Sequence, residues 1–117
     1  MTERTYTRVA QLERLCLPGP KVMAAAAISV GVLEGRWYCA CEYSLPTGEG
    51  GGEGLGFSNT SPRREGYPSR EAAIRAACDR LRWHMSDRRE IAKKHHAWLD
   101  EIERSLDQPD LFGGLAA

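Results

Sequence analysis

The stretch Arg36-Trp37-Tyr38-Cys39-Ala40-Cys41-Glu42-Tyr43-Ser44 shows the clearest pattern in this sequence. Apolar and aromatic side chains recur at every second position, and a period of two is typical of a strand with one buried face. One face is expected to carry Trp37, Cys39, Cys41 and Tyr43, and the other Tyr38, Ala40, Glu42 and Ser44. We therefore expect the fold to be organised around a strand over residues 36–44.

Two further strands are predicted on either side of it. Alternation between Met23 and Leu33 favours a strand, although four alanines near its start keep a helix as the alternative. The segment from Pro46 to Gly56 contains six glycines, a composition that predicts a flexible hairpin loop. A short strand over residues 54–59 is then expected to complete a three-stranded antiparallel meander.

Helical spacing of apolar residues appears in three segments. Residues 7–17 carry such spacing and are followed by Pro18-Gly19-Pro20, which predicts a short amphipathic helix. Ser69 is a suitable N-cap for a helix that continues to Met85. Asp87 and Glu90 form a candidate second capping box, so periodicity leaves open whether residues 69–106 are one helix or two. The last apolar stripe is Ile91, His95, Trp98, Leu99, Ile102 and Leu106, with Lys93, Lys94, His96, Glu101 and Arg104 facing outward and Pro109 beyond the helix end.

These elements together predict an α+β fold, a three-stranded antiparallel sheet packed on one face by helices. A chain of 117 residues is long enough for one hydrophobic core. We expect a single domain over residues 1–106 and an exposed, mobile C-terminal peptide over residues 107–117. The core is expected to contain Trp37, Tyr43, Phe57, Ile74, Leu81, Trp98 and Leu99.

Composition narrows the classes of partner. Sixteen basic and sixteen acidic side chains cancel, so no overall charge attracts the chain to nucleic acid or to an anionic membrane. The longest apolar run, residues 22–33, is too short to span a bilayer, and the residues ahead of it do not resemble a signal peptide. We expect a cytoplasmic protein with no membrane partner.

The reactive residue types predict neither an enzyme nor a cofactor site. Cytoplasmic thiols stay reduced, so the four cysteines are interpreted as small core residues. Cys39 and Cys41, with His84 or His95 as further ligands, lack the second ligand pair that makes a zinc motif specific. The glycine-rich segment matches no nucleotide-binding pattern, and no serine or cysteine has the local signature of a nucleophile. No catalytic residue, metal or cofactor is predicted.

The stretch Gln108-Pro109-Asp110-Leu111-Phe112 has the form of a binding peptide. Because Pro109 cannot lie inside a helix, Leu111 and Phe112 are expected on extended chain, where they are able to fill a partner's pocket. The alternative is that both side chains fold back onto their own domain. The stretch resembles the bacterial sliding-clamp-binding peptide, Gln-Leu-(Ser or Asp)-Leu-Phe, with matches at Gln108, Asp110, Leu111 and Phe112 and with Pro109 in place of the commoner leucine. The resemblance implies a non-enzymatic adaptor or inhibitor that binds the sliding clamp of DNA replication.

A second hypothesis is nucleic-acid binding through a basic helix face. Residues 63–94 include ten basic and five acidic side chains, and Arg75, Arg82 and Arg89 recur every seven positions, which lines one face of a continuous helix. Such a face is able to follow phosphates, whereas the alternative is a solvated face paired with neighbouring carboxylates.

The predicted order of elements resembles that of the double-stranded RNA-binding domain. The order is a helix, three strands, a glycine-rich segment and a helix that begins Ser69-Arg70-Glu71-Ala72-Ala73-Ile74-Arg75-Ala76-Ala77. Arg70-Glu71 stands where that family has a lysine pair, and residues 59–68 are an insertion.

A third hypothesis is a homodimer formed through apolar surface around Trp83 and Trp98.

Overall fold

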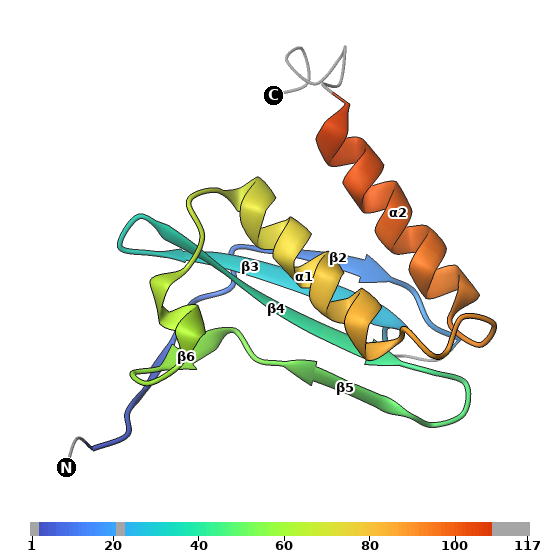
Figure 1. The fold of residues 1–117 in the computed structure, drawn as a ribbon, viewed down its shortest axis with the longest axis horizontal. Helices are drawn as coiled ribbons and strands as arrows, with labels where there is room; N and C mark the ends of the chain where they lie inside the picture. The colour runs from blue at the N-terminus through green and yellow to red at the C-terminus, as the bar shows by residue number, and fades with distance from the viewer. Residues whose placement is uncertain (1–2, 21–22, 109–117) are drawn as a thin grey trace.

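The computed structural model describes residues 3–20 and 23–108, which form an α+β fold. The strands β2, β3, β4 and β5 form an antiparallel sheet in that order, and β1 pairs with β6 in a separate two-stranded ribbon (Figure 1). The elements are β1 (Tyr6–Arg8), β2 (Glu13–Leu17), β3 (Ala26–Leu33), β4 (Arg36–Ser44), β5 (Gly50–Glu53), β6 (Gly56–Ser58), the 3-10 helix η1 (Pro62–Glu65), α1 (Arg70–His84) and α2 (Lys93–Asp107). The predicted fold class is confirmed, but there are more strands than the predicted three.

The hairpin of β3 and β4 forms the middle of the sheet, as the alternating pattern predicted. The two strands pair from Leu33 and Arg36 at the turn to Ala26 and Tyr43 at the far end. Glu34 and Gly35 both adopt positive φ, at 51° and 79°, which is the conformation that a tight two-residue hairpin turn requires. The strand predictions for residues 23–33 and 36–44 are therefore confirmed, with β3 beginning at Ala26.

The hydrophobic core lies between this sheet and α1, which crosses one face of the sheet (Figure 1). The helix begins where it was predicted, because the Ser69 side chain accepts a hydrogen bond from Ala72 N at 3.1 Å. Of the expected core residues, Ile74, Leu81 and Leu99 are fully buried, whereas Trp37, Tyr43 and Trp98 are partly buried against the core. Phe57 was wrongly placed there. It stacks on Tyr38, on the other face of the sheet, with ring centroids 4.9 Å apart.

The predicted helix over residues 7–17 is wrong. This segment forms β1, a connection over residues 9–12 that crosses over β3 at Gly31, and β2. β2 pairs along its whole length with the edge of β3, and this pairing satisfies backbone groups that a helix would have satisfied internally. Leu12 is exposed and Val9 is buried, although a helix would have placed these two side chains on one face. Since the chain begins with strands, its order of elements also departs from that of the double-stranded RNA-binding domain.

The glycine-rich segment was predicted as a loop, but it contains β5, which pairs with the end of β4. A Cβ at Gly50 would lie 2.8 Å from the Tyr43 carbonyl oxygen, so this strand approaches β4 more closely than a side chain would allow. The strand predicted over residues 54–59 exists as β6. It pairs with β1, not with β4, so the predicted three-stranded meander is wrong.

Residues 69–106 form two helices, separated by turns over residues 85–92. The candidate capping box of Asp87 and Glu90 is not formed, because Ala92 is the N-cap of α2 and supplies no side-chain hydrogen bond. His95 is buried on α2 as the apolar stripe predicted, and α2 ends at Asp107, before Pro109. The prediction that His96 faces water is wrong, because its Nε2 lies 3.1 Å from the Met85 carbonyl oxygen in a partly buried position.

Candidate functional site

The first candidate site is the junction between α2 and the C-terminal peptide. Gln108 follows the last helical residue, has extended backbone angles of φ −92° and ψ 116°, and is exposed. Its amide still donates to the Arg104 carbonyl oxygen at 3.0 Å, which closes the helix. The other residues of the predicted peptide, Asp110, Leu111 and Phe112, lie outside the described residues. The described chain therefore leaves its helix at the first residue of the motif.

Arg75 and Arg82, two members of the predicted basic stripe, are both engaged by carboxylates. Arg75 contacts Glu71 at 3.0 Å and also Asp107, at the end of α2. Arg82 contacts Asp100 at 2.9 Å and Glu103, both on α2. The contacts with Asp107, Asp100 and Glu103 join α1 to α2, and both guanidinium groups already have anionic partners within the chain.

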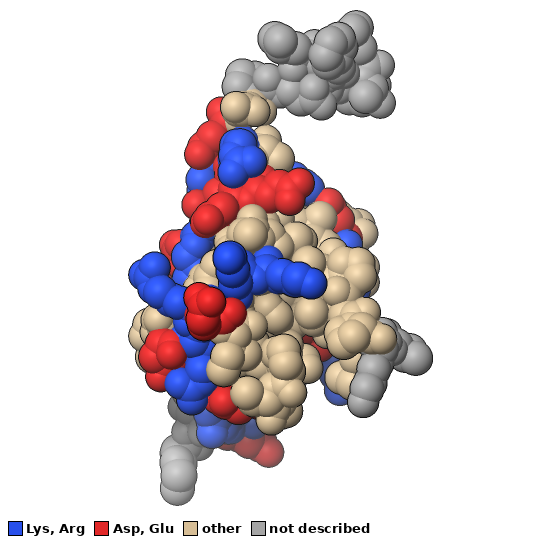
Figure 2. Space-filling view, turned by 90° about the vertical axis from the view of Figure 1, so that its right-hand side faces the viewer, with Lys and Arg blue, Asp and Glu red and all other residues tan. Residues whose placement is uncertain are grey.

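Arg89, the third member of the stripe, does not share a helix with the other two. It is exposed in the turns that follow α1, because that helix ends at His84. The seven-residue spacing therefore does not place the three arginines on one continuous helix face. Figure 2 shows acidic side chains interspersed with basic ones towards the upper end of the molecule, the end at which α2 lies in Figure 1.

Glu53, on β5, is the centre of a second charged cluster. Its carboxylate contacts Arg80 of α1 at 2.9 Å and Arg63 of η1 at 3.2 Å. The hydrogen bond from Arg80, with the charges of both arginines, holds the pKa of the Glu53 carboxyl below its usual range. His84 Nε2 lies 3.9 Å from the same carboxylate. The cluster fixes β5 to the helical layer, and its charges are largely satisfied internally.

Three of the four cysteines have the properties of core residues, whereas the prediction is wrong for Cys16, which is exposed on the edge strand β2. Burial raises the pKa of Cys39 to about 11 and the pKa values of Cys41 and Cys78 to about 12. A thiol with such a pKa is almost entirely protonated at neutral pH and is a poor nucleophile. Within residues 3–20 and 23–108, no group of three or more His, Cys, Asp or Glu side chains is placed to hold a metal ion.

The apolar surface proposed for a homodimer is present at one of its two tryptophans. Trp83, near the end of α1, is 69% exposed. Trp98, on α2, is instead partly buried and packs against the core. Any dimer contact at this end of the molecule would therefore be made chiefly by Trp83.

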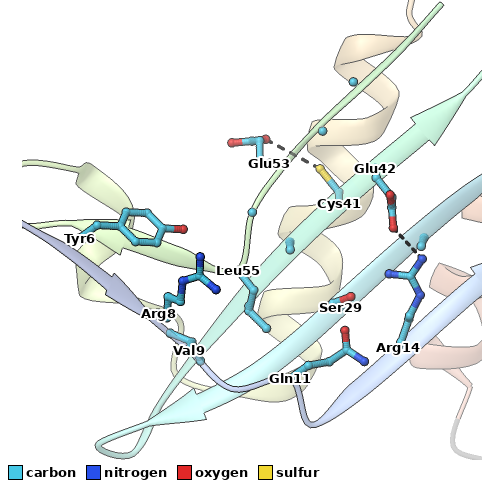
Figure 3. Close-up of a pocket in the computed structure, with 15 residues that line it drawn as sticks. Tyr6, Arg8, Val9, Gln11, Arg14, Ser29, Cys41, Glu42, Glu53 and Leu55 are labelled. Carbon is cyan, nitrogen blue, oxygen red and sulfur yellow. Dashed lines mark hydrogen bonds and ion pairs between the residues drawn. The ribbon is translucent and has the colours of Figure 1, made fainter.

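A cleft of about 640 Å³ lies on the face of the sheet opposite α1, and the sequence did not indicate it (Figure 3). Its floor is formed by small residues of β3 and β4, Ala27, Ser29 and Ala40, which alternate with the core-facing residues. The segment from Tyr6 to Arg14 lines one side of the cleft, and residues 51–55 line the other. The cleft therefore combines segments that are far apart in the sequence.

Four polar side chains in this cleft have no hydrogen bond or ion pair with any described residue: Tyr6, Arg8, Gln11 and Ser29. Ser29 is the most informative of them, because its residue is only 6% exposed and yet its hydroxyl lines the cleft. The other charged side chains here are partnered, since Arg14 contacts Glu42 at 2.6 Å and Glu53 binds the arginines of η1 and α1. The alternation along β3 predicts that the Ser29 side chain faces away from the core. It does not predict that other segments form a cleft over this side chain.

Among the described residues, no helix combines the length and the apolar character needed to cross a bilayer. No protein family, no curated protein and no solved structure matches this chain. The function of the chain is therefore inferred from its own residues.

Proposed function

We propose that this protein is a non-enzymatic adaptor or inhibitor that binds a protein partner through its C-terminal peptide, and that the partner is the bacterial sliding clamp. Leu111 and Phe112 are the proposed anchors, while Gln108 makes the orienting hydrogen bonds and Asp110 is a secondary contact. Two large apolar side chains that enter one pocket are typical of the few residues that carry most of the binding energy of an interface.

The observation that supports this proposal is the end of α2 at Asp107. Gln108 is exposed and extended, so the motif begins where the helix ends and its first side chain is accessible to a partner. A peptide that started inside the helix would have to unwind a turn before binding, at a cost in free energy. No such cost applies to Gln108.

A double substitution tests the proposal directly. We expect Leu111→Ala with Phe112→Ala to weaken binding to a purified bacterial sliding clamp by roughly a thousandfold, because each truncated anchor costs about 2 kcal/mol in affinity. Surface plasmon resonance measures the affinity. Thermal unfolding should give the same midpoint as the unaltered chain, because the proposal places neither side chain in the core.

The matched control is Leu115→Ala, which removes an apolar side chain of the same segment outside the motif. Its affinity for the clamp should equal that of the unaltered chain. If the unaltered chain does not bind the clamp, or if the double variant binds as well as the control, the clamp is not the partner.

Nucleic-acid binding through Arg75, Arg82 and Arg89 is a weaker proposal. Arg75 and Arg82 would have to exchange carboxylates of their own chain for phosphates, and Arg89 lies on a different element. Binding of this kind decreases steeply as salt increases. Titration of duplex DNA and duplex RNA at two salt concentrations distinguishes it from clamp binding.

A further inference from the structure

We infer that the cleft between β1 and β5 is a binding site for a small organic anion that carries a planar ring. This site is separate from the C-terminal peptide, since none of its lining residues belongs to α2. The cleft volume of about 640 Å³ lies within the range of small-molecule sites, which is roughly 300–1,000 Å³.

The charge of the ligand follows from the balance of charges in the cleft. Four charged residues line it: Arg8, Arg14, Glu42 and Glu53. The Arg14–Glu42 pair is neutral, and Glu53 is more than compensated by Arg63 and Arg80. Arg8 alone among the four lacks a partner of opposite charge in the described chain. The unbalanced charge is therefore positive, and a carboxylate or phosphate group is the complementary partner for the planar guanidinium.

The ring of the ligand follows from the apolar surfaces on either side of Arg8. Tyr6 and Arg8 lie two positions apart on β1, so their side chains share one face of that strand. Figure 3 shows the Tyr6 ring and the Arg8 guanidinium beside each other, with Leu55 close to Arg8. Tyr6 is 57% exposed, which leaves its ring available for stacking. A flat ligand between Tyr6 and Leu55 would therefore bring its anionic group to Arg8.

The floor of the cleft supplies hydrogen bonds. The Ser29 residue is only 6% exposed, but its hydroxyl is open to the cleft, where a ligand is able to replace the water that binds it. Gln11 offers an amide from the rim of the cleft. The small neighbours Ala27 and Ala40 leave space above Ser29, where larger residues would fill the cleft from below. The floor is thus polar at Ser29 and apolar at the two alanines.

The test uses three small probes and the full-length, isotope-labelled chain. Benzoate combines the ring with a negative charge, benzamidine has the same ring with a positive charge, and inorganic phosphate has negative charge without a ring. We expect benzoate to shift the backbone amide signals of Arg8, Ser29 and Gly54 in two-dimensional NMR spectra. Benzamidine and phosphate should bind roughly tenfold more weakly, because each lacks one of the two interactions.

Variants establish whether binding occurs in this cleft. Arg8→Gln should weaken benzoate binding by roughly tenfold or more, and Ser29→Ala by about threefold. Arg104→Gln is the matched control, since it removes an exposed arginine of α2 that does not line the cleft, and it should leave the affinity unchanged. The NMR spectrum of each variant shows whether it remains folded.

Three results would overturn the inference. The first is the absence of any benzoate-dependent shift among the cleft amides up to the solubility limit of benzoate. The second is equal benzoate affinity in Arg8→Gln and in the unaltered chain. The third is binding of benzamidine or phosphate as strong as that of benzoate, since the site would then not recognise a ring that carries a negative charge.

Discussion

Gly31 is the residue over which the N-terminal segment crosses the sheet. A Cβ built at Gly31 would overlap the carbonyl oxygen of Ala10 and would lie 2.8 Å from Cγ1 of Val9. The requirement for glycine is therefore steric: the backbone of residues 9–10 lies directly on β3, where a side chain would otherwise stand. This contact holds one wall of the cleft in position.

We expect Gly31→Ala to lower the free energy of unfolding by about 1–3 kcal/mol, because the crossing segment must move away from the sheet to make room for the methyl group. Urea denaturation measures the change. Gly54→Ala is the control, since a Cβ there meets only the Tyr6 hydroxyl, at 3.5 Å. If the two variants unfold at the same urea concentration, the crossing is not tightly packed.

At the scale of elements, His95 connects α2 to the sheet. Its Nε2 lies 3.1 Å from the carbonyl oxygen of Ala25 and 3.0 Å from that of Ser44. Because both partners are acceptors, Nε2 carries the hydrogen and donates to the start of β3 and the end of β4 together. The helix is thus attached at its first turn to both strands of the central hairpin.

Removing the imidazole should loosen this attachment. We expect His95→Ala to cost about 2–4 kcal/mol in stability, because it removes the hydrogen bonds to the Ala25 and Ser44 carbonyl groups and creates a cavity at a buried position. Lys94→Ala changes the preceding, exposed residue and should have little effect. Thermal or urea unfolding of both variants measures the difference, and similar stabilities would show that α2 is held by its apolar contacts alone.

The sequence correctly predicted the elements whose local residue pattern matches the way they pack in the folded protein. The alternation over residues 36–44 and the Ser69 cap predicted β4 and the start of α1. The helix prediction failed over residues 7–17 because the apolar residues in that spacing belong to separate elements, β1, a connecting segment and β2, and pairing with β3 decided the outcome. β5 was missed because its glycines were interpreted as flexibility, although they permit close approach to β4.

The candidate sites differ in the same way. The peptide that begins at Gln108 is contiguous, so it is visible in the sequence. The cleft is assembled from the segment that runs from β1 into β2, from β3 and β4, and from β5 with the two residues that follow it, and its existence depends on the pairing of β1 with β6. That pairing joins two very short strands, and no local pattern specifies it.

For the molecule as a whole, the cysteines report on unfolding. Cys16 is exposed, Cys39 is partly buried, and Cys41 and Cys78 are buried. At pH 8 we expect one thiol, Cys16, to react rapidly with a thiol reagent and the other three to react only as the protein opens. All four should react at once in denaturing urea. More than one rapidly reacting thiol in the native protein would contradict this packing of the cysteines.

The same thiols give an expected pH dependence. The folded pKa values of three of them, about 11 for Cys39 and about 12 for Cys41 and Cys78, are above the value of about 8.5 for an unfolded thiol. The folded state therefore retains protons that the unfolded state releases, so this contribution to stability is complete below about pH 8 and decreases as the pH rises through 9 and 10. Melting temperatures measured between about pH 8 and pH 10 should therefore fall as the pH rises.

The pairing of β1 with β6 also determines at what stage of synthesis the fold of this protein is completed. Thr5 and Asn59, which extend that ribbon, bond to each other across 54 positions of the chain. The ribosome synthesises β1 long before β6. β1 therefore stays unpaired at a stage when β2, β3 and β4 are already able to pair with one another. The cleft beside β1 thus belongs to the finished molecule, and a nascent chain would acquire it only after the sheet.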